Sequence, residues 1–192
     1  MARTKEFDPQ KALETAMNTF WRLGYERTSL DVLMQETGIA RQSLYDTFGD
    51  KRALYLQALA QYRDKDHARL RRLFTSGQRI KGGFAAVLLG ISRESREEHQ
   101  RGCLLLSANM EREAKDKVIA EFLLANQLKT ETIFTEALQR GQATGELSSK
   151  HDPAALARFY VATIQGLRAM AKLNSNRQAL EQVANLALSR LD

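Results

Sequence analysis

Three side chains near the start of the chain combine the types and the spacing needed to read DNA bases. Arg41, Gln42 and Tyr45 lie on a short predicted helix whose inward face is marked by Leu44 and Phe48, four residues apart. In the major groove, an arginine donates two hydrogen bonds to guanine and a glutamine pairs with adenine. The three side chains that point away from the inward face therefore form a candidate base-reading surface.

Side chains that suit phosphate oxygens surround this surface. Hydroxyl groups donate to phosphate oxygens, and a lysine in the first turn of a helix adds a cation beside a helix N-terminus, which itself attracts anions. The candidate phosphate-binding residues are Thr28, Ser29, Ser43, Tyr45, Thr47 and Lys51. Composition alone leaves open that all of these side chains belong to a solvated helix face.

Two short helices around Gly38 would position these groups. The sequence predicts helices over 29–36 and 40–47, joined by the turn 37–39, in which Gly38 permits a tight bend and Ile39 anchors it to the core. In a helix-turn-helix of this kind, the second helix lies in the DNA major groove and the first crosses the backbone.

The rest of the chain also predicts helices. Both prolines follow aspartate, at Asp8-Pro9 and Asp152-Pro153, and each pair starts a helix because proline suits the first helical position and aspartate caps the free N–H groups. No alternating β-branched runs predict strands. The other predicted helices are 9–23, a long helix from its cap at Asp50 to about 74, and 84–98, 103–114, 117–140, 153–173 and 177–191.

Composition narrows the class of protein. The length of 192 residues favours one domain, or one with a small appendage. The chain has 29 basic and 23 acidic side chains, and the resulting net charge of +6 favours polyanionic partners. Residues 1–63 carry nine basic and eight acidic side chains, so DNA binding would depend on a few positioned cations rather than a basic tail. The longest uncharged stretch, 82–92, is too short to cross a membrane, and no signal peptide is visible. A single cysteine indicates a reducing cytoplasm.

The string TSLDVLMQETGIARQSLYDTFGDKRALY, residues 28–55, resembles the DNA-binding signature of the TetR (tetracycline repressor) family. FWRLGYERTS before it resembles the end of the first helix of that family. One departure is Ala40, where the family often has serine, and it removes a possible helix cap and phosphate contact. The matching positions are Thr28, Ser29, Gly38, Leu44, Tyr45, Phe48, Lys51 and Leu54.

The resemblance implies an all-α protein with a three-helix DNA-binding head, residues 1–51, and a helical ligand-binding and dimerisation body, residues 52–192. It implies a homodimer formed through about 153–191 that represses transcription at a pseudo-palindromic double-stranded DNA operator and leaves it when a small-molecule inducer binds. It places Arg41, Gln42 and Tyr45 against bases or adjoining backbone. Arg3 and Lys5 in the N-terminal arm would reach the backbone or the minor groove. Such a protein is cytoplasmic and associates with the bacterial nucleoid when bound to DNA.

The inducer would contact inward apolar and aromatic side chains of the middle helices, although stripes at helical spacing are usually packing. The candidates are Tyr62, Phe84, Leu88, Met110, Phe122, Phe134 and Tyr160. Cys103 is a candidate thiol sensor, because Gly102 predicts a helix start there and Arg101 lies nearby, but a packed cysteine is the commoner role.

Other classes of function lack their motifs. We expect no enzyme, cofactor, metal site or membrane partner, because the chain has no glycine-rich phosphate loop, nucleophile elbow or metal-ligand spacing. A helical protein-interaction module would explain the helices and the charge but not the ordered motif around Gly38. A transcriptional activator without small-molecule control stays open as an alternative to a repressor.

Overall fold

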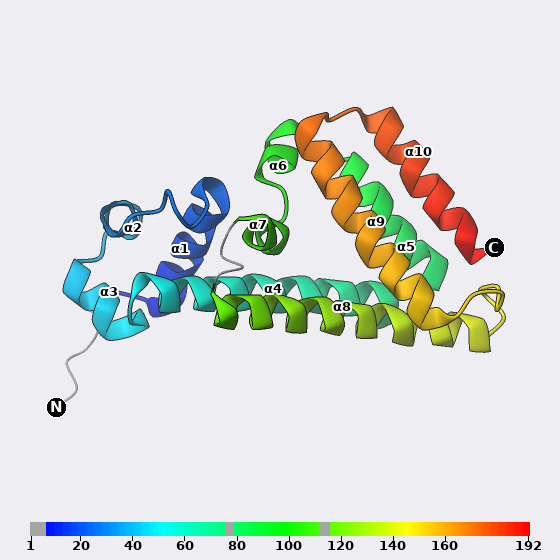
Figure 1. Ribbon diagram of the computed structural model, residues 1–192, viewed down its shortest axis with the longest axis horizontal. Coiled ribbons are helices and arrows are strands. Elements are labelled where there is room, and N and C mark those ends of the chain that lie inside the picture. Colours follow the sequence, from blue (N-terminus) through cyan, green and yellow to red (C-terminus); the bar gives the residue numbers. More distant parts are fainter. Residues whose placement is uncertain (1–6, 76–78, 112–115) are drawn as a thin grey trace. The chain divides into compact units, whose positions relative to one another are not determined.

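The computed structural model describes residues 7–75, 79–111 and 116–192, and this part of the chain is helical and contains no strand (Figure 1). Arg3 and Lys5 lie outside the described residues. The elements are α1 (Pro9–Leu23), α2 (Leu30–Thr37), α3 (Arg41–Phe48), α4 (Lys51–Thr75), α5 (Ile80–Ser92), α6 (Arg96–Arg101), α7 (Leu104–Met110), α8 (Lys117–Ala143), α9 (Pro153–Leu173), α10 (Arg177–Leu188) and a 3₁₀ turn η2 (Ser189–Leu191). The all-α prediction is confirmed.

The aspartate–proline pairs start helices as predicted. The Asp8 carboxylate accepts from the backbone N–H of Gln10 at 2.8 Å, and the Asp152 carboxylate accepts from that of Ala155 at 2.7 Å. α1 and α9 therefore have the predicted bounds. α2, α3 and α4 lie within about one residue of the predicted ranges, a difference that is ordinary for helix ends.

The predicted helix 84–98 is wrong, because the chain forms two helices there. α5 begins four residues earlier, at Ile80, and α6 begins only at Arg96. A capping box separates them: the Ser95 hydroxyl accepts from the Glu98 backbone N–H at 3.2 Å, and the Glu98 carboxylate accepts from that of Ser95 at 2.7 Å. The predicted helix 103–114 starts at Leu104 and ends at Met110, and residues 112–115 lie outside the described part.

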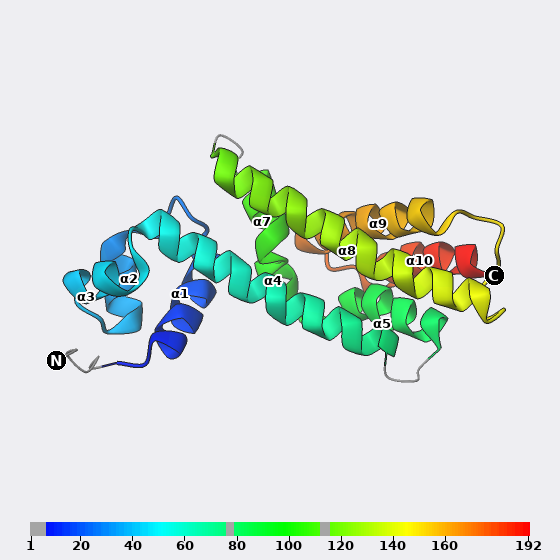
Figure 2. The same ribbon diagram turned by 90° about the horizontal axis from the view of Figure 1, so that it is seen from below.

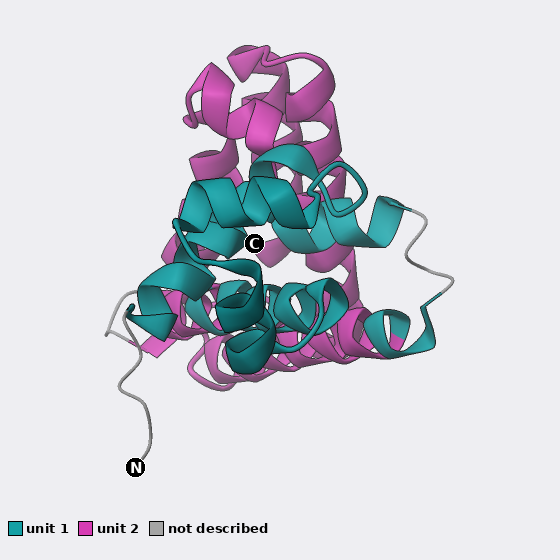
Figure 3. Cartoon of the chain, turned by 90° about the vertical axis from the view of Figure 1, so that its left-hand side faces the viewer, with its two compact units in different colours: residues 1–65, 103–120 teal, residues 66–102, 121–192 magenta. Residues whose placement is uncertain are grey.

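The chain forms two compact units (Figure 3). Unit 1 comprises residues 1–65 and 103–120, and unit 2 comprises residues 66–102 and 121–192. α7 and the start of α8 therefore belong to the same unit as the first three helices. The predicted boundary after residue 51 separates a DNA-binding domain from a ligand-binding and dimerisation domain, and this boundary stays a prediction.

Aromatic side chains fill the core of unit 2. α5, α9 and α10 lie side by side (Figures 1 and 2). Phe84 is fully buried, with its ring centroid 4.4 Å from that of Tyr160 and 5.2 Å from that of Phe134. The Tyr160 hydroxyl donates to the Ala187 carbonyl at 3.0 Å, and burial raises the pKa of this phenol. This core fixes the relative positions of the three helices.

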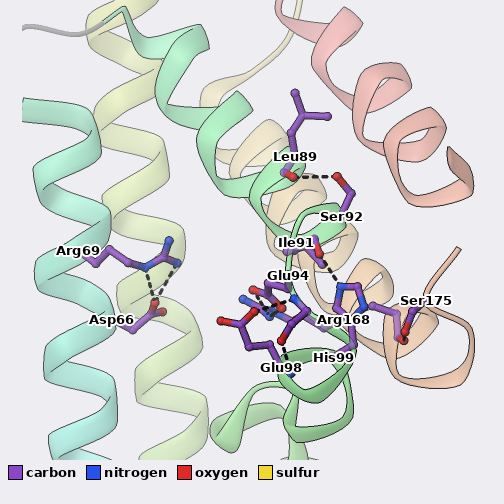
Figure 4. A network of polar contacts seen from close by, with 12 residues as sticks. Asp66, Arg69, Leu89, Ile91, Ser92, Glu94, Glu98, His99, Arg168 and Ser175 are labelled. Atoms are coloured by element: carbon purple, nitrogen blue, oxygen red, sulfur yellow. Dashed lines mark hydrogen bonds and ion pairs between the residues drawn. The ribbon is translucent and has the colours of Figure 1, made fainter. Parts of the chain in front are cut away.

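A small polar network joins α5, α6 and α9 at one end of this unit (Figure 4). Arg168 Nη1 donates to Glu94 Oε1 at 2.6 Å, with about a fifth of each side chain exposed. The buried His99 ring donates through Nε2 to the Ile91 carbonyl at 2.6 Å. The Ile91 carbonyl at the end of α5 thus accepts from the His99 ring as well as from the Glu94 backbone N–H, and these contacts connect the end of α5 to α6.

Two neighbouring glycines of α5 predict opposite effects on stability. A Cβ at Gly83 would lie 2.6 Å from Phe74 Cε1 and 3.0 Å from the Leu73 carbonyl oxygen, whereas one at Gly82 would meet nothing within 4 Å. We expect Gly83→Ala to destabilise the protein by about 1–2 kcal/mol through overpacking. Gly82→Ala should stabilise it by up to ~1 kcal/mol, because alanine favours the helix. Urea unfolding of both variants tests this, and a stabilising effect at both positions would contradict the packing of α5 against Phe74.

Candidate nucleic-acid interface

The helix-turn-helix frame forms as predicted and is built from α2 and α3. Ser29 caps α2 by accepting from the Val32 backbone N–H at 3.2 Å. Gly38 has a φ of 70°, a left-handed conformation that glycine adopts without strain, so it turns the chain between the helices. Leu33, Leu44 and Phe48 are buried and hold both helices in place. Ala40 provides no side-chain cap for α3.

The outward face of α3 carries the predicted base readers. Arg41, Gln42 and Tyr45 are all exposed. Two carboxylates hold the first two: Arg41 Nη2 donates to Asp31 Oδ1 at 3.0 Å, and Gln42 Nε2 donates to Asp46 Oδ1 at 2.8 Å. The face therefore presents two donors that each pair with a neighbouring carboxylate. The sequence reasoning missed both carboxylates. The spacing of four residues could have revealed the pair on α3, but nothing in the sequence signals a contact between residues 31 and 41.

The hydroxyl candidates divide into accessible and inaccessible groups. Ser29 is exposed, and Ser43 and Thr47 are partly exposed. The prediction that Thr28 contacts phosphate is wrong. Its side chain is fully buried and its hydroxyl donates to the Gly24 carbonyl at 2.6 Å, so it closes the turn after α1. A hydroxyl pair in the sequence does not show which member points outward.

Lys51 begins α4 directly after the cap residue Asp50, whose carboxylate accepts from the Ala53 backbone N–H at 2.7 Å. The Lys51 ammonium lies 4.1 Å from the centroid of the Tyr25 ring. A cation over an aromatic face is attracted by the ring and held in one region. The predicted phosphate-binding cation is therefore positioned by a residue of the turn between α1 and α2.

A second cation of the first turn of α4 joins this helix to α8 within unit 1. The Arg52 guanidinium pairs with both oxygens of Asp116, with Nη2 to Oδ1 at 2.6 Å. Asp116 also accepts from the Val118 backbone N–H at 3.0 Å, at the start of α8. The hydrogen bonds from Arg52 hold the pKa of Asp116 at about 2, below its ordinary 3.8. Sequence reasoning did not find this ion pair, because its two members are 64 residues apart.

The lowered pKa of Asp116 predicts a pH-dependent contribution to stability. A carboxyl group whose pKa is lower in the folded state stabilises the fold above its unfolded pKa of 3.8, and this contribution is lost as the pH falls toward 2. We expect Asp116→Asn, which keeps the helix cap, to lower the melting temperature more at about pH 6 than at about pH 2.5. Asp64→Asn, which removes an exposed carboxylate paired with the adjacent Arg63, is the control. A deficit of equal size at both pH values would contradict the ion pair.

The predicted inducer-contacting residues have different environments. Four of them, Phe84, Leu88, Phe134 and Tyr160, are fully buried core residues of unit 2. Tyr62 and Phe122 are partly buried, and the Tyr62 ring lies 4.8 Å from that of Trp21. The prediction that Met110 points inward is wrong, because it is 70% exposed at the end of α7. Contact of the other six with a ligand stays a prediction.

Cys103 occupies the N-cap position of α7, so the helix start predicted after Gly102 is confirmed. The thiol is a free cysteine of intermediate exposure, and its role as a sensor stays a prediction. Across residues 7–75, 79–111 and 116–192, no three His, Cys, Asp or Glu side chains gather as a metal site would require. None of the helices in that part of the chain is both long and apolar enough to span a bilayer.

A helix-turn-helix with exposed hydrogen-bond donors on its second helix, followed by a long helix and further helices, is typical of a DNA-binding transcriptional regulator. Comparison with known families gives the particular class. The family described as "Bacterial regulatory proteins, tetR family" matches residues 12–58, and "Tetracyclin repressor-like, C-terminal domain" matches residues 76–187. The chain belongs to the TetR family of transcriptional regulators.

Individual relatives agree with this assignment. The chain is 33% identical over 195 residues to the uncharacterized HTH-type transcriptional regulator YezE of Bacillus subtilis, and the match covers 100% of both. It is 29% identical to the HTH-type transcriptional repressor ComR of Escherichia coli, over 97% of this chain and 90% of ComR. Among solved structures, a cysteine mutant of the TetR family regulator CifR complexed with 26-base-pair operator DNA has a TM-score of 0.86 and 31% identity, with 100% of both chains covered.

Proposed function

We propose that this protein represses transcription by binding a pseudo-palindromic operator as a homodimer, that a small-molecule inducer releases it, and that it acts on the nucleoid in the bacterial cytoplasm. The observation that carries the proposal is the outward face of α3, where Arg41, Gln42 and Tyr45 are exposed on the second helix of the helix-turn-helix. Two similar proteins support it, because ComR is named a repressor and CifR is bound to operator DNA.

An unpartnered apolar face on α9 and α10 supports the homodimer. Phe159, Met170 and Leu173 of α9 are 42%, 41% and 90% exposed, and Leu186 of α10 is 65% exposed. Gly166 lies between them on α9, is exposed, and has nothing within 4 Å of an ideal Cβ. A helix-interior glycine that its own chain does not require lets another helix approach closely. A second copy of the same face would bury these side chains in an isologous four-helix arrangement.

The inducer would act by preferring one conformation, because a ligand that binds two conformations equally shifts neither. Partly exposed Tyr62 in unit 1 and Phe122 in unit 2 are the aromatic candidates that the two cores leave incompletely covered. Each unit also buries an amide oxygen without a hydrogen-bond partner among the described residues, Gln61 Oε1 in unit 1 and Asn126 Oδ1 in unit 2. A buried acceptor of this kind favours a ligand that can donate a hydrogen bond.

Selection of binding sites from random double-stranded DNA tests the proposal. We expect a pseudo-palindrome whose half-sites are separated by about one helical turn or a multiple, 34–36 Å per turn. Affinity should fall steeply with salt while sequence preference persists. Recovery of no preferred sequence would contradict the base-reading surface. A library of small metabolites screened for loss of operator binding tests the inducer. Failure to find any compound that releases the protein would favour control without a ligand.

Replacing Lys51 tests the phosphate contacts. We expect Lys51→Ala to weaken binding to operator and to random DNA by similar factors, and to lower the salt slope by about one for each phosphate that the lysine neutralises. Titrations at several salt concentrations measure both quantities. Lys129→Ala, which removes an exposed lysine from α8, is the control and should leave the slope unchanged. A slope that Lys51→Ala does not alter would remove this residue from the interface.

A further inference from the structure

The exposed guanidinium of Arg41 shares its surface with a carboxylate. Asp31 lies in the first turn of α2, and its Oδ1 accepts from Arg41 Nη2 at 3.0 Å. The Arg41 side chain is 57% exposed and that of Asp31 is 81% exposed, so the pair lies in water on the surface of the head. Exposed ion pairs of this kind contribute about 0–1 kcal/mol to stability, so this pair adds little to the stability of the fold.

A carboxylate at this point changes how the arginine meets DNA. A free arginine binds phosphate oxygens of any sequence, and such contacts dominate non-specific affinity. Asp31 neutralises the charge of Arg41. In a complex it would also bring a negative charge toward the phosphate backbone of DNA, which disfavours a contact between Arg41 and phosphate. The guanidinium has five N–H donors, and the ion pair uses one of them, so others can still donate to the O6 and N7 atoms of guanine.

We propose that Asp31 is a specificity-determining positioning residue: it holds Arg41 in the orientation for guanine and suppresses the binding of the same side chain to random DNA. The proposal rests on the proposed base-reading role of Arg41. The neighbouring pair of Gln42 with Asp46, at 2.8 Å, orients a second reader in the same way but involves a neutral amide and so carries no charge argument.

The head supplies a matched control. Arg22 Nη2 pairs with Glu36 Oε1 at 2.6 Å, and the two side chains are 57% and 39% exposed. Glu36→Gln therefore removes one negative charge and one exposed ion pair from the same three-helix head without touching α3. Any general effect of lowering the negative charge of the head appears equally in Glu36→Gln and in Asp31→Asn.

The experiment measures dissociation constants of the full-length protein for the selected operator and for random DNA of equal length, across a range of salt concentrations. For Asp31→Asn we expect random DNA to bind about tenfold more tightly, with a salt slope larger by about one, and the operator to gain less, so that the specificity ratio falls. For Glu36→Gln we expect at most about a twofold change in both constants and a constant ratio. An Asp31→Asn variant with the ratio of Glu36→Gln would overturn the proposal.

A double-mutant cycle with Arg41→Ala separates this proposal from the base-reading role on which it rests. If Asp31 acts through Arg41, Asp31→Asn should change the ratio in the wild-type background but not in the Arg41→Ala background, because the partner it controls is gone. If Arg41→Ala alone leaves the ratio unchanged, the base-reading role fails. If Arg41→Ala lowers the ratio but Asp31→Asn lowers it equally in both backgrounds, the base-reading role stands and the positioning role is overturned.

Discussion

A Gly166→Glu variant is expected to fold as a monomer and to lose on the order of 100-fold or more in operator affinity. Gly166 is exposed at the middle of the apolar face of α9, and a Cβ there meets nothing within 4 Å of its own chain. Glutamate therefore fits the single chain and also favours the helix. In a dimer formed through this face, its carboxylate would be buried without a partner, and the cost of that desolvation far exceeds any benefit from packing its two methylenes.

The loss of affinity follows from the geometry of a palindrome. In a dimer, the first head that binds holds the second near its half-site, and a monomer lacks this increase in local concentration. Gly82→Glu, the same change at an exposed glycine of α5 with nothing within 4 Å, is the control. Analytical ultracentrifugation gives the oligomeric state and operator titrations give the affinity. A Gly166→Glu variant that stays dimeric would place the dimer interface elsewhere.

The second large effect is expected from Arg41→Ala. Loss of a bidentate contact to guanine costs about 1–3 kcal/mol of discrimination at one base pair, and a palindrome contains that contact twice. Affinity for the operator should therefore fall much more than affinity for random DNA. The variant should keep its fold, because Arg41 is exposed and its ion pair with the exposed Asp31 contributes little to stability.

Arg22→Ala is the matched control for this experiment, because Arg22 is also 57% exposed and also paired with a carboxylate of the head. It should change operator and random-DNA binding by the same factor. Competition titrations with single-base operator variants then identify the position that Arg41 reads. Equal losses on operator and random DNA for Arg41→Ala would show a phosphate contact in place of a base contact.

The sequence alone predicted those features that depend on neighbours a few residues apart. Asp8-Pro9 and Asp152-Pro153 fixed the starts of α1 and α9, because a cap and its helix are local. Gly38 marked the turn for the same reason. The wrong prediction of a single helix over 84–98 could have been corrected from the sequence too, since Ser95 and Glu98 have capping-box spacing.

Tertiary structure decided which side chains are available and which are paired. Thr28 and Ser29 are adjacent and chemically alike, yet Thr28 is buried, with its hydroxyl donating to the Gly24 carbonyl, and Ser29 is exposed. Arg52 and Asp116 are 64 residues apart, and only folding brings them together. Asp31 and Arg41 lie on different helices of the same motif. Capping and periodicity act over a few residues, so the sequence by itself predicted most of the helices and the helix-turn-helix motif. Its resemblance to the TetR signature indicated the family. The burial and pairing of its functional groups were decided by contacts between segments distant in the chain.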